Sequence, residues 1–435
     1  MRVSSHSPVL FILLFIIVLS LQSIHASPQN DDGLVSVEWT RIVDDMRGFS
    51  QALLLGDRTI IATGISSLDN TTLTIITIDL YSGEVEGVRS ILLGGANSVI
   101  LCTAIVDNKL VVGSASDYIL YKNISLVEFN GEDAIAIGHL LLEPSVTPYS
   151  ASCNGDTLFI AGSIIADPKT RSPYIVKARV AQGTMDMSSE AVYSEYINMT
   201  IIDITVVKED IIASMRPIIG SPGKLGTGST ILALSRSTLE LSGKYDMGDT
   251  TTVVGVKADG RGNIIAYGYD VNARGKIVIL DRVDLQPIST ITLEAPSIIT
   301  AVSGYNDLIV GAGSVILKDK TVPILLVYDG SVNAQPRTYT IDEWEDLIVT
   351  SVIPVSPVEY ILAGFMNGKA FMGKLRVSQP FTPGITSETA PTQRESVGLM
   401  DPVTLMLMIS TVTLMIIVIG LAIMLYRKRS MTGRR

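Results

Sequence analysis

The chain has 435 residues, with 33 Lys and Arg against 43 Asp and Glu, two cysteines and three histidines. A negative chain repels phosphate backbones, so we expect no nucleic-acid binding. His6 and His25 lie in the N-terminal leader described below and leave only His139, which argues against a His-based zinc site or a Ser-His-Asp triad. Two cysteines are too few for a disulfide scaffold, so the fold must depend on its own core.

Residues 1–26 predict a secretory signal peptide. Arg2 precedes an apolar run over residues 9–21, and the small residue Ala26 stands at the expected cleavage site. An uncleaved anchor is the alternative, because Ile24 is bulky for its position in such a site. We expect the mature chain to begin at residue 27.

The following 350 or so residues predict β-strands and essentially no helix. A phrase made of a turn, an aliphatic strand and then a small residue recurs at intervals of 43 to 54 residues. A period near 50 in a β-rich sequence is typical of a propeller or another repeat array. The small residues that end the phrases are Gly64, Gly113, Gly162, Ser214, Gly268, Gly311 and Gly364.

The last repeat offers three strands where the others offer four, and an additional strand over residues 35–43 precedes the first repeat. An N-terminal strand that completes the last blade would close the ring and leave no open sheet edge. We therefore predict an all-β fold, a seven-bladed β-propeller closed by an N-terminal strand, across residues 27–378. An extended solenoid or a pair of sandwiches is the alternative.

The hairpin over residues 259–268, Asp-Gly-Arg-Gly-Asn-Ile and then Gly268 four residues later, resembles the D-x-x-G-N-I-x-x-x-G hairpin of bacterial and archaeal propeller repeats. The resemblance covers one blade and implies a fold, not an activity. The Trp-Asp ending of WD repeats, the double Gly of kelch repeats and the Asp-box of sialidases are missing. The chain thus resembles generic β-propeller repeat ectodomains without pointing to a functional family.

The C-terminal part predicts attachment to a membrane. Residues 379–401 are rich in Pro, Ser and Thr and predict a flexible stem. Residues 402–426 predict one transmembrane helix, because their apolar run is long enough to cross a hydrocarbon core of about 30 Å. The tail 427–435 is basic and is expected in the cytoplasm, which makes the chain a single-pass type I protein of the cell membrane. Six of the 33 basic residues and none of the 43 acids lie in the leader or tail, so the exported part carries a net charge of −16.

Propeller geometry predicts which face is available to partners. Loops that join second to third strands share one face with the connections between blades, and four of these loops are long: residues 114–122, 164–173, 215–229 and 312–322. Long loops on a rigid ring commonly carry binding sites. The stem leaves from the opposite face, so the long loops should look outward. Their basic rim could dock an acidic protein or an anionic glycan, or simply be solvated: Lys169, Arg171, Arg216, Lys224, Arg274, Lys318 and Lys320.

Two connections between blades are acidic and provide a second candidate site. Facing carboxylates could hold Ca²⁺. With an indole as a stacking surface they could grip a sugar, or they could act as an acid/base pair on a glycosidic bond; solvated acids are the alternative. The candidates are Asp44, Asp45, Asp342, Glu343, Trp344, Glu345 and Asp346.

Three asparagines, Asn70, Asn123 and Asn198, stand in glycosylation sequons near the long-loop face. Cys102 and Cys153 fall on the first strands of adjacent blades, where either a disulfide or two buried thiols would fit. The Gly-rich stretch 220–228 lacks the order of a phosphate-binding loop and predicts a flexible loop.

These features favour a non-enzymatic ectodomain that binds a surface protein or a glycan, with no small-molecule cofactor and Ca²⁺ as the one metal considered. Two alternatives remain: an exocytoplasmic carbohydrate-active hydrolase or lyase that uses the acidic connections, and a structural scaffold of an envelope complex.

Overall fold

The computed structural model describes residues 35–378, except 119–120, 155, 168–169, 182–183, 219–227, 249, 318–319 and 330–335. The predicted signal peptide, stem, transmembrane helix and tail lie outside the described residues. In the described part, no helix is long and apolar enough to cross a membrane. The chain divides into two compact units, Met1–Phe381 and Thr382–Arg435, and every described residue belongs to the first.

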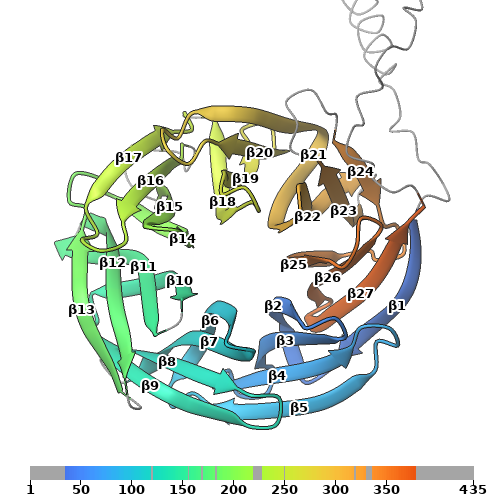
Figure 1. The fold of residues 1–435 in the computed structure, drawn as a ribbon, viewed down its shortest axis with the longest axis horizontal. Helices are drawn as coiled ribbons and strands as arrows, with labels where there is room; N and C mark the ends of the chain where they lie inside the picture. The colour runs from blue at the N-terminus through green and yellow to red at the C-terminus, as the bar shows by residue number, and fades with distance from the viewer. Residues whose placement is uncertain are drawn as a thin grey trace, which may run out of the picture. The chain divides into compact units, whose positions relative to one another are not determined.

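All regular structure in the described part is β-strand, arranged as five four-stranded sheets and one seven-stranded sheet. The sheets stand around a ring in chain order, as the colours of Figure 1 show. Within each sheet, strands that follow one another along the chain pair antiparallel, as expected for strands joined by short hairpins.

The strand bounds follow sheet by sheet. One sheet holds β2 (Met46–Leu55), β3 (Thr59–Ser66), β4 (Thr72–Asp79) and β5 (Val85–Leu92). The next holds β6 (Ala96–Val106), β7 (Lys109–Tyr118), β8 (Tyr121–Phe129) and β9 (Ala134–Leu142). Then come β10 (Val146–Asn154), β11 (Thr157–Asp167), β12 (Thr170–Ala181) and β13 (Thr184–Val192), followed by β14 (Met199–Val207), β15 (Asp210–Pro217), β16 (Thr230–Ser235) and β17 (Leu241–Asp246). The seven-stranded sheet holds β18 (Thr251–Ala258), β19 (Ile264–Asp270), β20 (Arg274–Leu280), β21 (Pro287–Tyr305), β22 (Leu308–Leu317), β23 (Lys320–Tyr328) and β24 (Arg337–Thr340). The last holds β25 (Leu347–Pro354), β26 (Glu359–Met366), β27 (Lys369–Val377) and β1 (Val35–Val43).

The long strand β21 belongs to both parts of the seven-stranded sheet. Its residues up to Pro296 pair with β20, and its residues from Ser297 onward pair with β22. The sheet therefore has two parts that meet in one continuous strand.

The middle strands are buried on both sides, which explains their unbroken aliphatic runs. In β3, Ile60, Ile61 and Ala62 are all fully buried, because the two faces of each sheet pack against its two neighbours around the ring. Burial of one such side chain stabilises the fold by roughly 1.5–3 kcal/mol.

The N-terminal strand closes the ring, as predicted. β1 pairs with β27 from Val35 opposite Val377 to Val43 opposite Ala370. Lys374 of β27 is buried and contacts Glu38 of β1 at 2.8 Å.

A second set of contacts joins β1 to the first sheet. The ring of Trp39 covers Gly83 in the β4–β5 turn so closely that an added Cβ would lie 2.5 Å from the indole. Trp39 Nε1 donates to Leu80 O at 3.1 Å, and Arg41 Nε donates to Gly83 O at 2.7 Å. The closing strand thus bridges the last and first sheets.

Most of the repeated glycines lie opposite the residue just before a β-bulge in the innermost strand; in the β6–β7 pair Ser114 has this position and Gly113 follows the bulge. A Cβ added to Gly162, Gly313 or Gly364 would meet a backbone carbonyl oxygen of that bulged strand at 2.0, 1.9 or 2.0 Å. Gly313, not the predicted Gly311, is therefore the equivalent position in its repeat, because Gly313 lies opposite the bulge. In the β14–β15 pair the bulge is displaced by one residue, and Ser214 fits without this clash.

A disulfide between Cys102 of β6 and Cys153 of β10 joins two adjacent sheets, with a Cα–Cα distance of 6.2 Å. Gly113 provides the space, since a Cβ there would lie 2.6 Å from Cys102 Sγ. The predicted placement on first strands is confirmed, and the disulfide is the alternative that the structure adopts.

Candidate binding face

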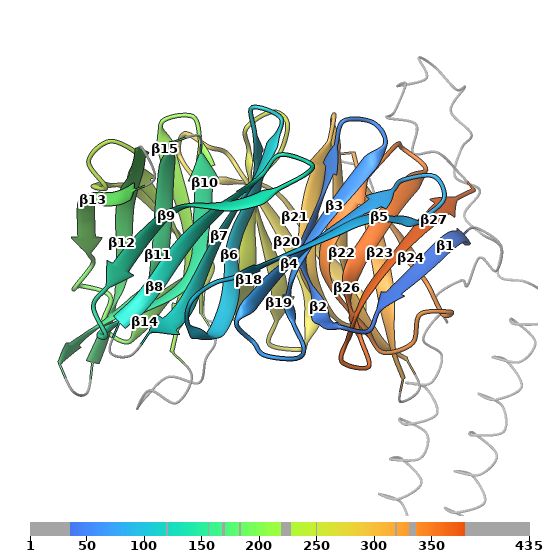
Figure 2. The same ribbon diagram turned by 90° about the horizontal axis from the view of Figure 1, so that it is seen from below.

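The two rims of the ring differ in their loops, which Figure 2 shows along opposite edges. We call the rim with the turns between first and second and between third and fourth strands the turn face. The rim with the hairpins between second and third strands and the connections between sheets is the tip face.

On the turn face, polar side chains hydrogen-bond to their own turns. Asp79 Oδ1 accepts from the backbone N–H groups of Tyr81 and Ser82 at 3.0 and 2.8 Å. The Ser82 hydrogen bond, with that of Arg58 at 2.7 Å, holds the pKa of Asp79 well below its usual range. Equivalent side chains capture backbone N–H groups in three other turns: Asn130, Ser235 and Asp281.

The tip face has similar capping, by Asp69 and Asp270, and also exposes large apolar side chains at recurring positions. Leu68 at the β3–β4 hairpin is 82% exposed, and Val271 at the β19–β20 hairpin is 55% exposed. Single exposed hydrophobics are ordinary on a protein surface, but their recurrence around one rim is typical of an interaction site. Others on or near this rim are Leu92, Val99, Tyr121, Leu141, Ile165, Val192, Ile197, Ile298, Ile316 and Ile348.

Three of the four described members of the predicted basic rim have partners within the fold. Lys320 is ion-paired with Glu345, and Arg274 contacts Asp270 at 2.7 Å. Arg171 Nη1 donates to Thr147 Oγ1 at 3.2 Å. No side chain in the described ranges pairs with the half-buried Arg216, and Lys169, Lys224 and Lys318 lie outside the described residues.

The acidic connections lie on the same face, and their side chains are exposed: Asp44, Asp45, Asp342, Glu343, Glu345 and Asp346. Asp44 contacts Lys369 at 2.7 Å, and Glu345 contacts Lys320. Within the described ranges, no three His, Cys, Asp or Glu side chains come together to hold a metal ion. Asp44 and Glu345, two of the predicted site acids, are thus engaged in surface ion pairs.

The expectation that Trp344 offers a stacking surface for a sugar is wrong, because only 2% of the residue is exposed. Its ring packs edge-on against Phe371, with centroids 5.1 Å apart. Trp344 N donates to Ile341 O at 3.1 Å, as Tyr196 N does to Tyr193 O in another connection. An alignment of the repeats that pairs Trp344 with Tyr196 would have identified it as part of the core.

The three sequons do lie near the tip face, but they differ in access. Asn123 is only 7% exposed, and its Nδ2 donates to Leu93 O at 3.2 Å and to Ser125 Oγ at 3.1 Å. The prediction that Asn123 is a glycan acceptor is thus wrong for the folded protein. Asn70 and Asn198 are partly exposed in left-handed turn conformations, with φ of 55° and 59°.

A pocket of about 530 Å³, which sequence reasoning missed, opens on the tip face where the first and last sheets meet. β2 is irregular at two points there, between Met46 and Phe49 and between Phe49 and Gln51. Such bulges re-aim side chains and are common beside binding sites. The lining residues are Arg47, Gly48, Phe49, Ser50, Ile65, Thr350, Phe365 and Gly368.

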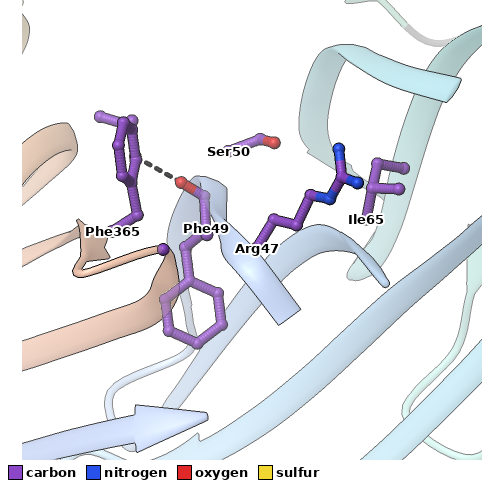
Figure 3. Close-up of a pocket in the computed structure, with 8 residues that line it drawn as sticks. Arg47, Phe49, Ser50, Ile65 and Phe365 are labelled. Atoms are coloured by element: carbon purple, nitrogen blue, oxygen red, sulfur yellow. Dashed lines mark hydrogen bonds between the residues drawn. The ribbon is translucent and has the colours of Figure 1, made fainter. Parts of the chain in front are cut away.

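The pocket combines an apolar wall with one cation. Figure 3 shows the side chain of Arg47 extending toward Ile65, with Phe365 on the opposite side. The wall is rigid, because Thr350 Oγ1 donates to Phe49 O at 2.5 Å and an added Cβ on Gly48 would lie 2.8 Å from Phe365 Cβ. The arrangement suits a ligand with an apolar part and a negative charge.

A second pocket, of about 680 Å³, lies on the turn face between the β18–β19 and β21–β22 turns. It includes Asp259, whose Oδ1 accepts from the backbone N–H groups of Arg261 and Asn263 at 2.9 and 2.8 Å. Asp307 contacts Arg261 at 3.0 Å. The carboxylates of Asp259 and Asp307 in this pocket therefore already make contacts within the fold.

No family model matches the chain, and no curated protein matches it. Among solved structures it is similar to Raptor from Chaetomium thermophilum, with a TM-score of 0.51 and 13% identity over 79% of this chain and 29% of that one. The chain thus spans less than a third of Raptor. It is also similar to YCF48 bound to a D1 peptide, with a TM-score of 0.49 and 11% identity over 83% of this chain and 99% of that one. At such identities likeness shows the fold alone, and together with the ring of antiparallel sheets it identifies a β-propeller-type fold.

Proposed function

We propose that this protein is a seven-bladed, membrane-anchored β-propeller that binds a protein partner through its tip face without catalysis. The blade number follows if β21 is divided at Pro296, so that the seven-stranded sheet becomes two blades beside the five four-stranded ones. The anchor rests on the apolar run 402–426 and the leader 1–26.

The recurring exposed apolar side chains of the tip face carry this proposal. Their removal from water by a partner is favourable by roughly 25 cal/mol per Å² of apolar surface. They stand on a rigid ring, which keeps the ordering cost of binding low. The turn face exposes fewer such groups, among them Tyr81, Ile135 and Val283.

The orientation of the ring supports the same choice of face. Because Val35 pairs with Val377, β1 begins and β27 ends at the turn face. A stem that follows β27 would hold that face toward the membrane and present the tip face outward.

A matched pair of positions tests the proposal. Leu68 on the tip face and Val283 on the turn face are 82% and 84% exposed. A photo-crosslinking residue at either position of the full chain, in its native membrane, should yield a protein adduct at 68 and none at 283. Equal adducts at both, or none at 68, would contradict binding through the tip face.

The topology has its own test. An impermeant amine reagent added to intact cells should modify Lys320, which is exposed. Modification that requires cell lysis would contradict an outward ectodomain while leaving the fold unaffected.

The two other functions considered from the sequence gain no support from the described side chains. A hydrolase would need two facing carboxylates, and in the described ranges no side-chain contact is seen between any two of the six candidate acids, of which Asp44 and Glu345 pair with Lys369 and Lys320. No observation favours a purely structural scaffold over a binding protein.

A further inference from the structure

The pocket beside β2 contains a cation that the fold does not use. Arg47 is exposed, and within the described ranges no side chain forms an ion pair or hydrogen bond with its guanidinium group. Its neighbours on the tip face differ, since Lys369 contacts Asp44 and Lys320 contacts Glu345. Arg47 is therefore available to a ligand.

The surroundings of Arg47 define what it would bind. The guanidinium presents a planar fork of N–H donors that matches a carboxylate. Phe365 and Ile65 line the same pocket and offer apolar surface within a volume of about 530 Å³. This size is within the range of about 300–1,000 Å³ found for ligand pockets, and it accommodates an aromatic or aliphatic group beside the carboxylate.

We propose that this pocket takes an acidic peptide segment of the protein partner, with its carboxylate on Arg47 and a neighbouring apolar side chain against Phe365. The inference rests on the proposed function and names the chemistry that the partner must supply. A peptide is favoured over a free metabolite because apolar surface continues beyond the pocket. Ile348 is 42% exposed near Thr350 on β25, and Ile298 is 38% exposed on the neighbouring β21.

The probes are two end-blocked tetrapeptides, Ac-Gly-Phe-Glu-Gly-NH2 and Ac-Gly-Phe-Gln-Gly-NH2, which differ only in the charge. Binding of each to the full chain in detergent is followed by ligand-observed NMR. The Glu peptide should bind at least about tenfold more tightly, as expected for a hydrogen bond to a charged group. Equal binding of the two peptides, or no binding of either, overturns the proposal.

Two substitutions with the same chemistry locate the site. Arg47→Gln should weaken binding of the Glu peptide by at least about tenfold and leave the Gln peptide unchanged. Arg216→Gln is the control, because Arg216 is another tip-face arginine without a described partner. If the two variants weaken binding equally, the site is not this pocket. Because Arg47 is exposed, its substitution should leave the thermal midpoint unchanged.

A photo-crosslinking residue at Ile65 identifies the natural occupant. An adduct on a different protein, mapped by mass spectrometry to an acidic segment, supports the proposal, and an adduct on residues 379–401 or on a second copy of this chain overturns it. If position 65 yields no partner adduct while position 68 does, the pocket is not the peptide site but binding through the tip face stands. If position 68 also yields no adduct, both proposals are wrong.

Discussion

The two faces of the ring are alike in the hydrogen bonding of their turns and differ in how many large apolar side chains they expose. On the turn face, Asp79, Asn130 and Asp281 bind the backbone of their own turns, so hydrogen-bonding capacity is used within the fold. On the tip face, Asp69 and Asp270 bind their own hairpins in the same way, but Leu68 and Val271 beside them are exposed apolar side chains. The tip face therefore differs from the turn face in its exposed apolar side chains and its pocket, and not in the hydrogen bonding of its turns.

Substitutions in the framework of sheets that supports both faces should lower the unfolding free energy the most. The disulfide between Cys102 and Cys153 closes a loop with a sequence separation of 51. In the chain-entropy model its removal costs roughly 2–4 kcal/mol of unfolding free energy. The double variant Cys102→Ala/Cys153→Ala should show this loss in denaturant unfolding of the full chain, and a loss below about 1 kcal/mol would mean that the sheet packing alone joins these blades.

A substitution at the repeated β-bulge should cause the second largest loss of unfolding free energy. Gly313→Ala places a Cβ 1.9 Å from Ile298 O, so we expect a loss of about 1–3 kcal/mol from overpacking. Ser214→Ala at the displaced bulge should cost less than about 1 kcal/mol. Equal costs in urea unfolding would show that the displaced bulge does not explain the serine.

The functional contrast between the faces can be tested with a charge on each. Leu68→Asp should weaken partner binding by about tenfold or more, since a buried apolar contact becomes a desolvated charge. Val283→Asp should leave binding unchanged, and both should stay within about 0.5 kcal/mol of wild-type stability. Pull-down with the partner identified by crosslinking measures this, and an equal loss for both would remove the distinction.

Acid should weaken the Asp79 turn, and this effect should be the smallest of the four. The pKa of Asp79 lies below its unfolded value of about 3.9, so its ionised form stabilises the fold above that pH. This stability is lost as the pH falls toward the folded pKa. Asp79→Asn should therefore flatten the decline of the melting temperature between about pH 5 and 2.

The arginine partner refines this test. Arg58→Gln should keep most of the decline, because the Ser82 backbone hydrogen bond is the larger cause of the low pKa. If the melting temperature of Arg58→Gln falls with pH as little as that of Asp79→Asn, Arg58 would be the main cause of the low pKa of Asp79.

Much of the fold could be predicted because the repeats are local. The aliphatic runs and their turns recur about every 50 residues, and the strand over residues 35–43 had no partner within its own repeat. Pairing rules for sheets then placed it on β27, as observed. The first-strand positions of Cys102 and Cys153 followed from the same repeat.

The predictions from sequence were wrong where burial or strand register in the folded ring determined the role of a residue. Trp344 stands among acids in the sequence, yet the connection turns its ring into the core against Phe371. Asn123 belongs to a sequon, yet it lies within β8, buried, with its amide bound to Leu93 O and Ser125 Oγ. Gly311 and Gly313 are both glycines, and only strand register shows that Gly313 faces the bulge.

By itself, the sequence determined the all-β repeat, the strand that closes the ring and the polar turns, because each depends on neighbours within one repeat. Only the tertiary structure decided the pocket. Arg47 and Phe365 are far apart along the chain and meet because ring closure places β2 beside β26. Ring closure also brings Lys369 to Asp44, whereas the packing of neighbouring sheets brings Lys320 to Glu345.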